Sequence, residues 1–288
     1  WIGAARPDLT FRESDAGADD GNRVYLAHCP ERVLPGRLMQ ELIENDRTVG
    51  GIDLPSAERA RDFYGAFVHG AIALSNARTA ELSKLVENAY RDVNIAFANE
   101  LSMICDGLDI DVWDVIELAN QHPRVNVLTP SAGVGGHCIA VDPWFIVASA
   151  PEQANLIRAA REANDAKPVH VAARVCAALA GRQGTTVACL GIAFKPDVDD
   201  LRGSPALEIV ASLAADGGLT ALVVEPHVGE LPPALAGLDN VELVELDAAL
   251  ERADVVALLV GHRPFREIDR ARLADKPIVD CTGAWRAS

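Results

Sequence analysis

The sequence of 288 residues lacks four patterns that mark common classes of protein. Its six cysteines are scattered with no Cys-x-x-Cys pair, which favours reduced thiols over a disulfide framework or a zinc site, so no metal is expected. It has no apolar run of membrane-spanning length and no signal-peptide pattern, which predicts a cytoplasmic protein with no membrane partner. It also has no Gly-x-Gly-x-x-Gly, the usual sign of a dinucleotide-binding sheet.

Positive charge is scarce as well. The chain has 26 Lys and Arg against 42 Asp and Glu, for a net charge of −16, which argues against a nucleic acid or an anionic membrane as partner. An anionic ligand would have to be held by a few local basic residues. The length predicts about two domains with ample core.

Glycine is concentrated directly before one cysteine. Residues 133–136 read Gly-Val-Gly-Gly, His137 and Cys138 follow, and a carboxylate, Asp142, comes four residues later. Glycines let a backbone approach a ligand closely, and a thiol at the start of a helix is stabilised as thiolate. The alternative is a packing loop beside an inert buried cysteine. The following helix could begin at Cys138 or at Asp142-Pro143, and the sequence leaves both positions open.

The residues before this loop have a helical pattern from about Ser56 to Leu108. Within it Lys84 and Asn88 are four residues apart, so they share a face, and Arg91 lies on an adjoining edge. Asparagine is a poor residue for the middle of a helix, which suggests that Asn88 has a partner; a solvated face is the alternative. A short helix is expected at 111–120 and a long helix at 155–179. The long helix is expected to be kinked or broken at Pro168.

The pattern changes after residue 184. Apolar strands are expected at 185–190, 220–224, 241–244, 255–260 and 277–279, with helices between most of them, which predicts a doubly wound parallel sheet. Ligands of such sheets bind beyond the carboxyl ends of the strands. After the first strand come Lys195, Arg202 and a helix start at Ser204-Pro205, which could hold a phosphate. Alternatively, Lys195 and Arg202 form ion pairs with nearby aspartates on the surface.

Four blocks of sequence in this order resemble the UDP-glucose/GDP-mannose dehydrogenase family. They are Cys-Pro-Glu-Arg-Val-Leu-Pro-Gly (29–36), the helical block 81–100, Gly-Val-Gly-Gly-His-Cys-Ile-Ala-Val-Asp-Pro-Trp-Phe (133–145) and Ala-Phe-Lys-Pro-Asp-Val-Asp-Asp-Leu-Arg (193–202). The resemblance implies an α/β chain with four segments. These are the end of an NAD-binding Rossmann domain (1–55, with a strand at 23–28), a helical dimerisation domain (56–153), connecting helices (154–183) and a Rossmann-like UDP-binding domain (184–288).

The resemblance also implies a four-electron oxidation of a sugar C6 alcohol to a carboxylate with two NAD⁺. Cys138 would form a thiohemiacetal and then a thioester with C6. Lys84 and Asn88 would stabilise the oxyanion, and Lys84 could carry the C6 proton. Asp142 would orient or activate the water or the thiol, and Glu31 would assist thioester hydrolysis.

The other implied residues bind ligands. Contacts with the UDP-sugar are expected from Arg32, Val33, Arg91, Gly135, Phe194 and Lys195. His122 and Arg124 would reach the sugar from the neighbouring subunit of a homodimer, and Arg202 would touch NAD. Thr282 stands where family members often carry a base for UDP. The expected activity is oxidation of UDP-N-acetyl-D-mannosamine, with UDP-N-acetylglucosamine or UDP-glucose as alternatives. A different alternative is a non-catalytic UDP-binding dimerisation module.

Overall fold

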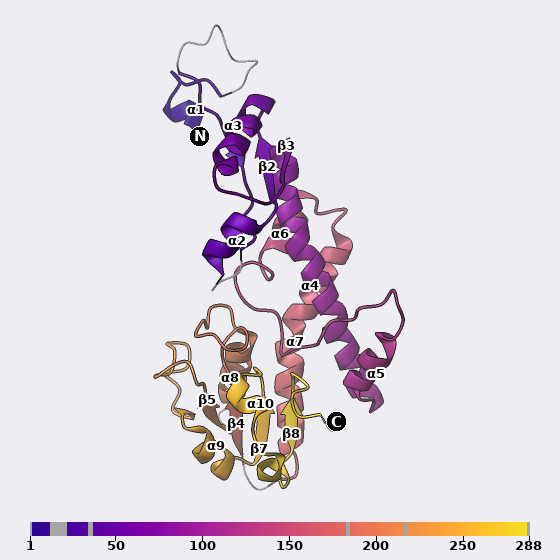
Figure 1. The fold of residues 1–288 in the computed structure, drawn as a ribbon. Coiled ribbons are helices and arrows are strands. Elements are labelled where there is room, and N and C mark those ends of the chain that lie inside the picture. The colour runs from indigo at the N-terminus through magenta and orange to yellow at the C-terminus, as the bar shows by residue number, and fades with distance from the viewer. Residues whose placement is uncertain (1, 12–21, 34–36, 183–184, 216–217, 287–288) are drawn as a thin grey trace. The chain divides into compact units, whose positions relative to one another are not determined.

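The computed structural model describes residues 2–11, 22–33, 37–182, 185–215 and 218–286. Its contacts divide the chain into two compact units, Trp1–Glu87 and Asn88–Ser288. The first contains a three-stranded sheet and the second a five-stranded sheet (Figure 1). None of the helices in the described ranges is both long and apolar enough to cross a membrane.

The first unit is built around one β-α-β crossover. Strands β2 and β3 pair in parallel, with Val49 opposite Leu74, and β1 pairs with β2 in the antiparallel direction. The crossover helix α3 begins at a side-chain cap, because Asp53 accepts the amide of Ser56 at 2.9 Å. The elements are α1 (Ile2–Ala5), β1 (Ala27–His28), α2 (Leu38–Glu44), β2 (Arg47–Gly51), α3 (Leu54–Gly65) and β3 (Ile72–Asn76).

Two local expectations in this unit are correct only in part. The helical pattern from Ser56 to Leu108 is interrupted by β3, whose residues form strand because β2 offers them a parallel partner. The expected strand at 23–28 is reduced to Ala27–His28, with a single bridge from Arg23 to Thr10. Residues 34–36, which end the first matching block, lie outside the described residues.

Four helices precede the second sheet. They are α4 (Ala77–Leu108), whose residues from Asn88 onward belong to the second unit, α5 (Val112–Ala119), α6 (Asp142–Ser149) and α7 (Asn155–Leu179). The short and long helices expected at 111–120 and 155–179 are confirmed. Of the kink or break expected at Pro168, the break does not occur, because Pro168 lies inside α7 without ending it.

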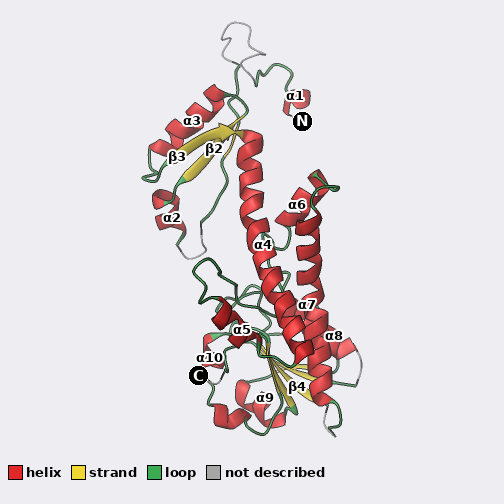
Figure 2. Cartoon of the chain, turned by 90° about the vertical axis from the view of Figure 1, so that its right-hand side faces the viewer, coloured by secondary structure: helices red, strands yellow, loops and turns green. Residues whose placement is uncertain are grey.

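The later part of α4 lies alongside α7 (Figure 2), and a buried polar network joins the two helices. The side chains of Arg161 and Asp92 are fully buried and form an ion pair, and Asn164 donates to Asp92 at 2.8 Å. Asn99 donates to Asn164 at 2.9 Å and accepts the amide of Ser131 at 2.8 Å. Burial raises the pKa of the Asp92 carboxyl, and the charge of Arg161 acts against that shift. These bonds fix the start of the glycine-rich loop on the helices.

The five-stranded sheet is wholly parallel, in the order β6-β5-β4-β7-β8, which confirms the predicted doubly wound architecture. The strands are β4 (Thr186–Leu190), β5 (Thr220–Val224), β6 (Val241–Leu243), β7 (Val255–Leu258) and β8 (Ile278–Asp280). The connecting helices are α8 (Pro205–Ala215), α9 (Leu246–Arg252), α10 (Arg263–Arg266) and the 3₁₀ turn Arg270–Leu273.

Both faces of this sheet are covered. In β4, Val187 and Cys189 pack into one apolar cluster with residues of α7 and α8, whereas Ala188 and Leu190 pack into another with residues of α9. Alternate residues of a strand point to opposite faces, so an all-apolar strand needs two covers. Each fully buried leucine or valine contributes roughly 1.5–3 kcal/mol to stability. The two covers leave the strand ends as the accessible edge.

Candidate functional site

Cys138 lies in a turn that leads directly into α6. Its carbonyl oxygen accepts the amides of Val141 at 3.2 Å and Asp142 at 2.9 Å, and α6 begins at Asp142. The helix therefore starts at the second of the two expected places, with Val141 rather than Asp142 as the capping residue. The Cys138 side chain is exposed, so the interpretation of an inert buried thiol is wrong for this residue.

Asp142 is tied to α4. The amide of the Asn88 side chain donates to its carboxylate at 2.5 Å, and Asn88 is buried. The partner expected for Asn88 is thus the carboxylate four residues after Cys138. Lys84 lies one turn before Asn88 on the same helix and is half-buried. The structure accordingly brings Asn88, Asp142 and the Cys138 turn together.

Glycine residues let the Cys138 loop lie against the first loop of the five-stranded sheet. A Cβ on Gly135 would lie 2.4 Å from the carbonyl oxygen of Gly203 and 3.1 Å from Cβ of Phe194. Gly136 has a φ of +82° and faces the ring of Phe194. No side chain fits in such space, so these glycines are required by close approach. Gly135 and Phe194, both expected to contact the ligand, are brought together.

A cavity of about 340 Å³ opens at the carboxyl ends of β4, β7 and β8. The strand order reverses between β4 and β7, and this switch point is where doubly wound sheets bind ligands. Its wall includes Ala206 at the start of α8, where Ser204 caps the helix as predicted by accepting the amide of Leu207. The cavity therefore lies where the sequence places a phosphate site.

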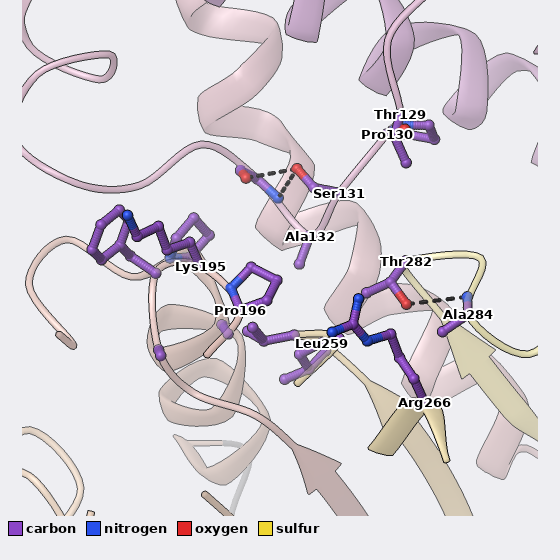
Figure 3. A pocket seen from close by; sticks show the side chains of 17 residues that line it. Thr129, Pro130, Ser131, Ala132, Lys195, Pro196, Leu259, Arg266, Thr282 and Ala284 are labelled. Carbon is purple, nitrogen blue, oxygen red and sulfur yellow. Dashed lines mark hydrogen bonds between the residues drawn. The ribbon is translucent and has the colours of Figure 1, made fainter. Parts of the chain in front are cut away.

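Two cations line this cavity. Lys195 comes from the loop after β4, and Arg266 comes from α10 after β7; in Figure 3 they lie at opposite sides of the view, with Thr282 beside Arg266. Lys195 was expected here, but Arg266 was not. The rule that points to Lys195, a base beyond the carboxyl end of a parallel strand, would also have found Arg266 after the strand at 255–260.

Arg202 forms a surface ion pair with an aspartate, which is the alternative that the sequence left open for this residue. Its guanidinium donates to Asp200 at 2.9 and 2.7 Å, and its side chain is 73% exposed. Hydrogen bonds from the Arg202 side chain and amide hold the pKa of Asp200 well below its usual range.

The remaining expected residues lie in several places. In the first unit, Glu31 accepts the amides of Arg32 and Val33 at 2.7 and 3.1 Å, and Arg32 forms an ion pair with Glu87. In the second unit, Arg91, His122 and Arg124 are exposed. His122 Nδ1 accepts the Arg124 amide at 3.3 Å. Their expected contacts with a sugar nucleotide stay predictions.

Comparison with known proteins identifies the family. The profile of the UDP-glucose/GDP-mannose dehydrogenase family, central domain, matches residues 78–166, and that of the family's UDP binding domain matches residues 188–287. The UDP-N-acetyl-D-mannosamine dehydrogenase of Escherichia coli (strain K12) is 51% identical over 99% of this chain and 69% of its own length. The chain belongs to the UDP-glucose/GDP-mannose dehydrogenase family.

Two more family members refine this comparison. The NDP-N-acetyl-D-galactosaminuronic acid dehydrogenase of Ralstonia nicotianae is 54% identical over 100% of this chain and 66% of its own length. A solved UDP-N-acetyl-mannosamine dehydrogenase from S. aureus superposes with a TM-score of 0.82 at 40% identity, over 100% of this chain and 66% of that one. The chain thus spans about two thirds of the length of the relatives it matches.

The five-stranded sheet does not fit NAD, the cofactor expected from the family. It has no glycine fingerprint after β4, and Glu225, at the end of β5, is buried and bonded to the protein's own amides. In dinucleotide-binding sheets an acidic residue in this region binds a ribose hydroxyl instead. The sheet is therefore built for a different ligand.

One group of side chains has the composition of a metal site. Asp197, His227 and His262 bring possible ligand atoms within 4.8 Å of one another. However, one ring nitrogen of His262 accepts the Asp197 amide and the other faces Glu225. Since both nitrogens are engaged within the protein, we assign no metal to this group.

Proposed function

We propose that this chain carries the UDP-sugar-binding and cysteine parts of a UDP-N-acetyl-D-mannosamine 6-dehydrogenase for surface polysaccharide synthesis. The observation that carries the proposal is the exposed Cys138 on a glycine loop packed against the loop that borders the cavity, with Asn88 and Asp142 hydrogen-bonded beside it. A thiol, an amide donor and a carboxylate near a cavity of nucleotide size suit acyl chemistry on a nucleotide sugar. A cytoplasmic location stays a prediction.

Each reacting residue has a role that its chemistry allows. The Cys138 sulfur bonds to C6 of the sugar aldehyde, and the carbonyl oxygen takes a proton, giving a thiohemiacetal. Lys84 and Asn88 stabilise the negative charge on that oxygen, and Asp142 orients water or the thiol. Glu31 assists the attack of water on the thioester, which releases the carboxylate and the thiol. NAD, the cofactor expected from the family, would accept one hydride as the C6 alcohol becomes the aldehyde and a second as the thiohemiacetal becomes the thioester, and Arg202 would contact it.

The cavity would hold the UDP moiety. Lys195, Arg266 and the start of α8 offer positive charge and amide donors to the diphosphate. Phe194 and Gly135 would contact the sugar nucleotide where the two loops meet. We propose further contacts with the sugar nucleotide for Arg32, Val33 and Arg91. His122 and Arg124 would contact it from the neighbouring subunit of a homodimer.

The sugar is chosen from the relatives' names. Relatives at 52% and 51% identity are named for UDP-N-acetyl-D-mannosamine, and two relatives at 54% and 52% are named for N-acetyl-D-galactosaminuronic acid. An N-acetylhexosamine is therefore the favoured sugar, and the galactosamine epimer is a second candidate. UDP-N-acetylglucosamine and UDP-glucose are the alternative substrates, and the rate of NADH formation with each should be compared with the rate for UDP-N-acetyl-D-mannosamine.

We also propose that the chain forms a homodimer through α4. Tyr90, Phe97 and Ile104 recur every seven residues and are 69%, 59% and 50% exposed, and Leu108 follows on the same face at 63%. A stripe of large apolar side chains along one helix is unfavourable in water unless a partner covers it. A second copy suits it because two copies of one stripe are complementary in length and spacing.

Acid formation tests the proposed function. The natural polypeptide that carries this chain, supplied with NAD and each UDP-sugar in turn, should form NADH fastest with UDP-N-acetyl-D-mannosamine. Cys138→Ala should abolish acid formation, whereas the matched control Cys176→Ala, another exposed cysteine, should retain it. No NADH with any of the sugar nucleotides would overturn the proposal, and normal acid formation by the Cys138 variant would remove this residue from the mechanism.

A further inference from the structure

Glu225 holds the loop that follows β4. Its Oε2 accepts the amides of Ile192 at 2.8 Å and Ala193 at 3.1 Å, and its Oε1 accepts the amide of His227 at 3.2 Å. Burial acts to raise the pKa of Glu225, but the hydrogen bonds from His262 and from these amides outweigh it and hold the pKa below its usual value. The buried carboxylate is thereby kept charged and fully bonded.

His262 connects this carboxylate to the next part of the loop. It is fully buried, its Nε2 lies 3.1 Å from Oε2 of Glu225, and its Nδ1 accepts the amide of Asp197 at 2.9 Å. A carboxylate only accepts hydrogen bonds, so Nε2 carries the proton and Nδ1 is the acceptor. The ring therefore links Glu225 to Asp197 in one tautomer.

Asp197 connects the chain of bonds to α10. It has a φ of +59°, which is costly for a residue other than glycine and persists only where the surroundings hold it. Its carboxylate accepts the amide of Arg263 at 2.8 Å and the guanidinium of Arg266 at 3.2 Å. Lys195 is two residues before Asp197, so the same bonds fix the backbone that carries it.

We infer that His262 and Asp197 act as positioning residues for the nucleotide site, by holding Lys195 and Arg266 where they meet a diphosphate, while the contact between His262 and Glu225 contributes stability. The two cations approach the cavity from different loops (Figure 3). The hydrogen-bonded chain is the connection between those loops. This inference rests on the proposed binding of UDP in that cavity.

A pair of substitutions at one position separates positioning from simple stability. The side-chain amide of His262→Gln can reach Glu225 in place of Nε2 but extends past the position of Nδ1, whereas the shorter amide of His262→Asn can accept the Asp197 amide in place of Nδ1 but does not reach Glu225. If the contact with Asp197 positions the cations, UDP affinity measured by titration calorimetry should fall about tenfold in the Gln variant, or ~1.4 kcal/mol. The Asn variant should keep affinity near that of the unaltered chain while melting at a lower temperature, because it leaves Glu225 short of a donor.

Two further variants complete the test. Asp197→Gly accepts the positive φ and removes the anchor of Arg266 from an exposed position, so it should fold and bind UDP several-fold more weakly. His170→Gln, on α7 away from the cavity, is the control and should bind normally. Unchanged affinity in both His262→Gln and Asp197→Gly, or equal losses in the two His262 variants, overturns the inference. Absence of UDP binding by the unaltered chain overturns the proposed function itself, and the inference with it.

Discussion

At the scale of single residues, burial separates the six cysteines into inert and accessible thiols. Desolvation raises the pKa of Cys189 and of Cys281 to about 12, and it raises the pKa of Cys105 as well. Cys138 and Cys176 are exposed. Free cysteines in a chain of this kind are expected to be buried, but Cys176, on α7, is exposed and Cys29 is half-buried.

This difference predicts the pattern of thiol modification. At pH 8 a thiol with a pKa of about 12 stays protonated, and burial also blocks the reagent, so Cys189 and Cys281 should remain unmodified by iodoacetamide in the folded chain. Cys138 should be modified, and excess UDP-sugar should slow its modification. Peptide mass spectrometry measures both, with the urea-unfolded chain as the control in which all six react. Rapid modification of Cys189 in the folded chain would contradict the buried sheet.

Sequence reasoning succeeds at residues whose role depends on local spacing. Ser204 caps α8, and Asn88 has a polar partner, because both follow from the demands of a helix on its own residues. His262 and Glu225 were missed because their roles arise from contacts between loops that follow different strands and lie far apart in the sequence. Only the order of the strands reveals those contacts.

At the scale of elements, the strands of the second sheet were predictable because they are short, mainly apolar runs, and β4, β5 and β7 are almost wholly buried. Strands β2 and β3 were not, since Arg47–Gly51 contains two glycines and Ile72–Asn76 continues directly into α4. Their strand conformation depends on mutual pairing rather than on composition. The order of the strands within a sheet, and the partner of each strand, are not visible in a local pattern of residues.

The glycine loop gives a prediction at the scale of elements. In Gly135→Ala the new Cβ would lie 2.4 Å from the Gly203 carbonyl oxygen, so the two loops must move apart and UDP affinity should fall at least tenfold. Gly107→Ala is the matched control, because a Cβ on Gly107 meets nothing within 4 Å in α4. That variant should bind UDP normally and gain roughly 0.5–1 kcal/mol of stability from helix propensity. Calorimetric titration and thermal melting measure these effects, and normal binding by the Gly135 variant would show that the loops need not touch.

At the scale of the whole molecule, the net charge of −16 makes the local cations decisive. An acidic surface repels a nucleoside diphosphate, so binding depends on a site where positive groups and amides outnumber carboxylates. Lys195, Arg266 and the start of α8 meet that requirement at one edge of the sheet. The Asp197 carboxylate lies beside Arg266 but is itself bonded to protein donors.

The same chain should bind nucleotide without oxidising sugar. Its sequence contains no glycine fingerprint, and Glu225 is committed to the loop after β4, so we expect the 288-residue polypeptide to bind UDP but to bind NAD negligibly. UDP should raise its melting temperature, since a ligand that binds only the folded state stabilises it. The same sample, given UDP-N-acetyl-D-mannosamine and NAD, should form no NADH above the level of a Cys138→Ala control. Sustained NADH formation that requires Cys138 would show that these 288 residues already contain a complete site for the oxidant.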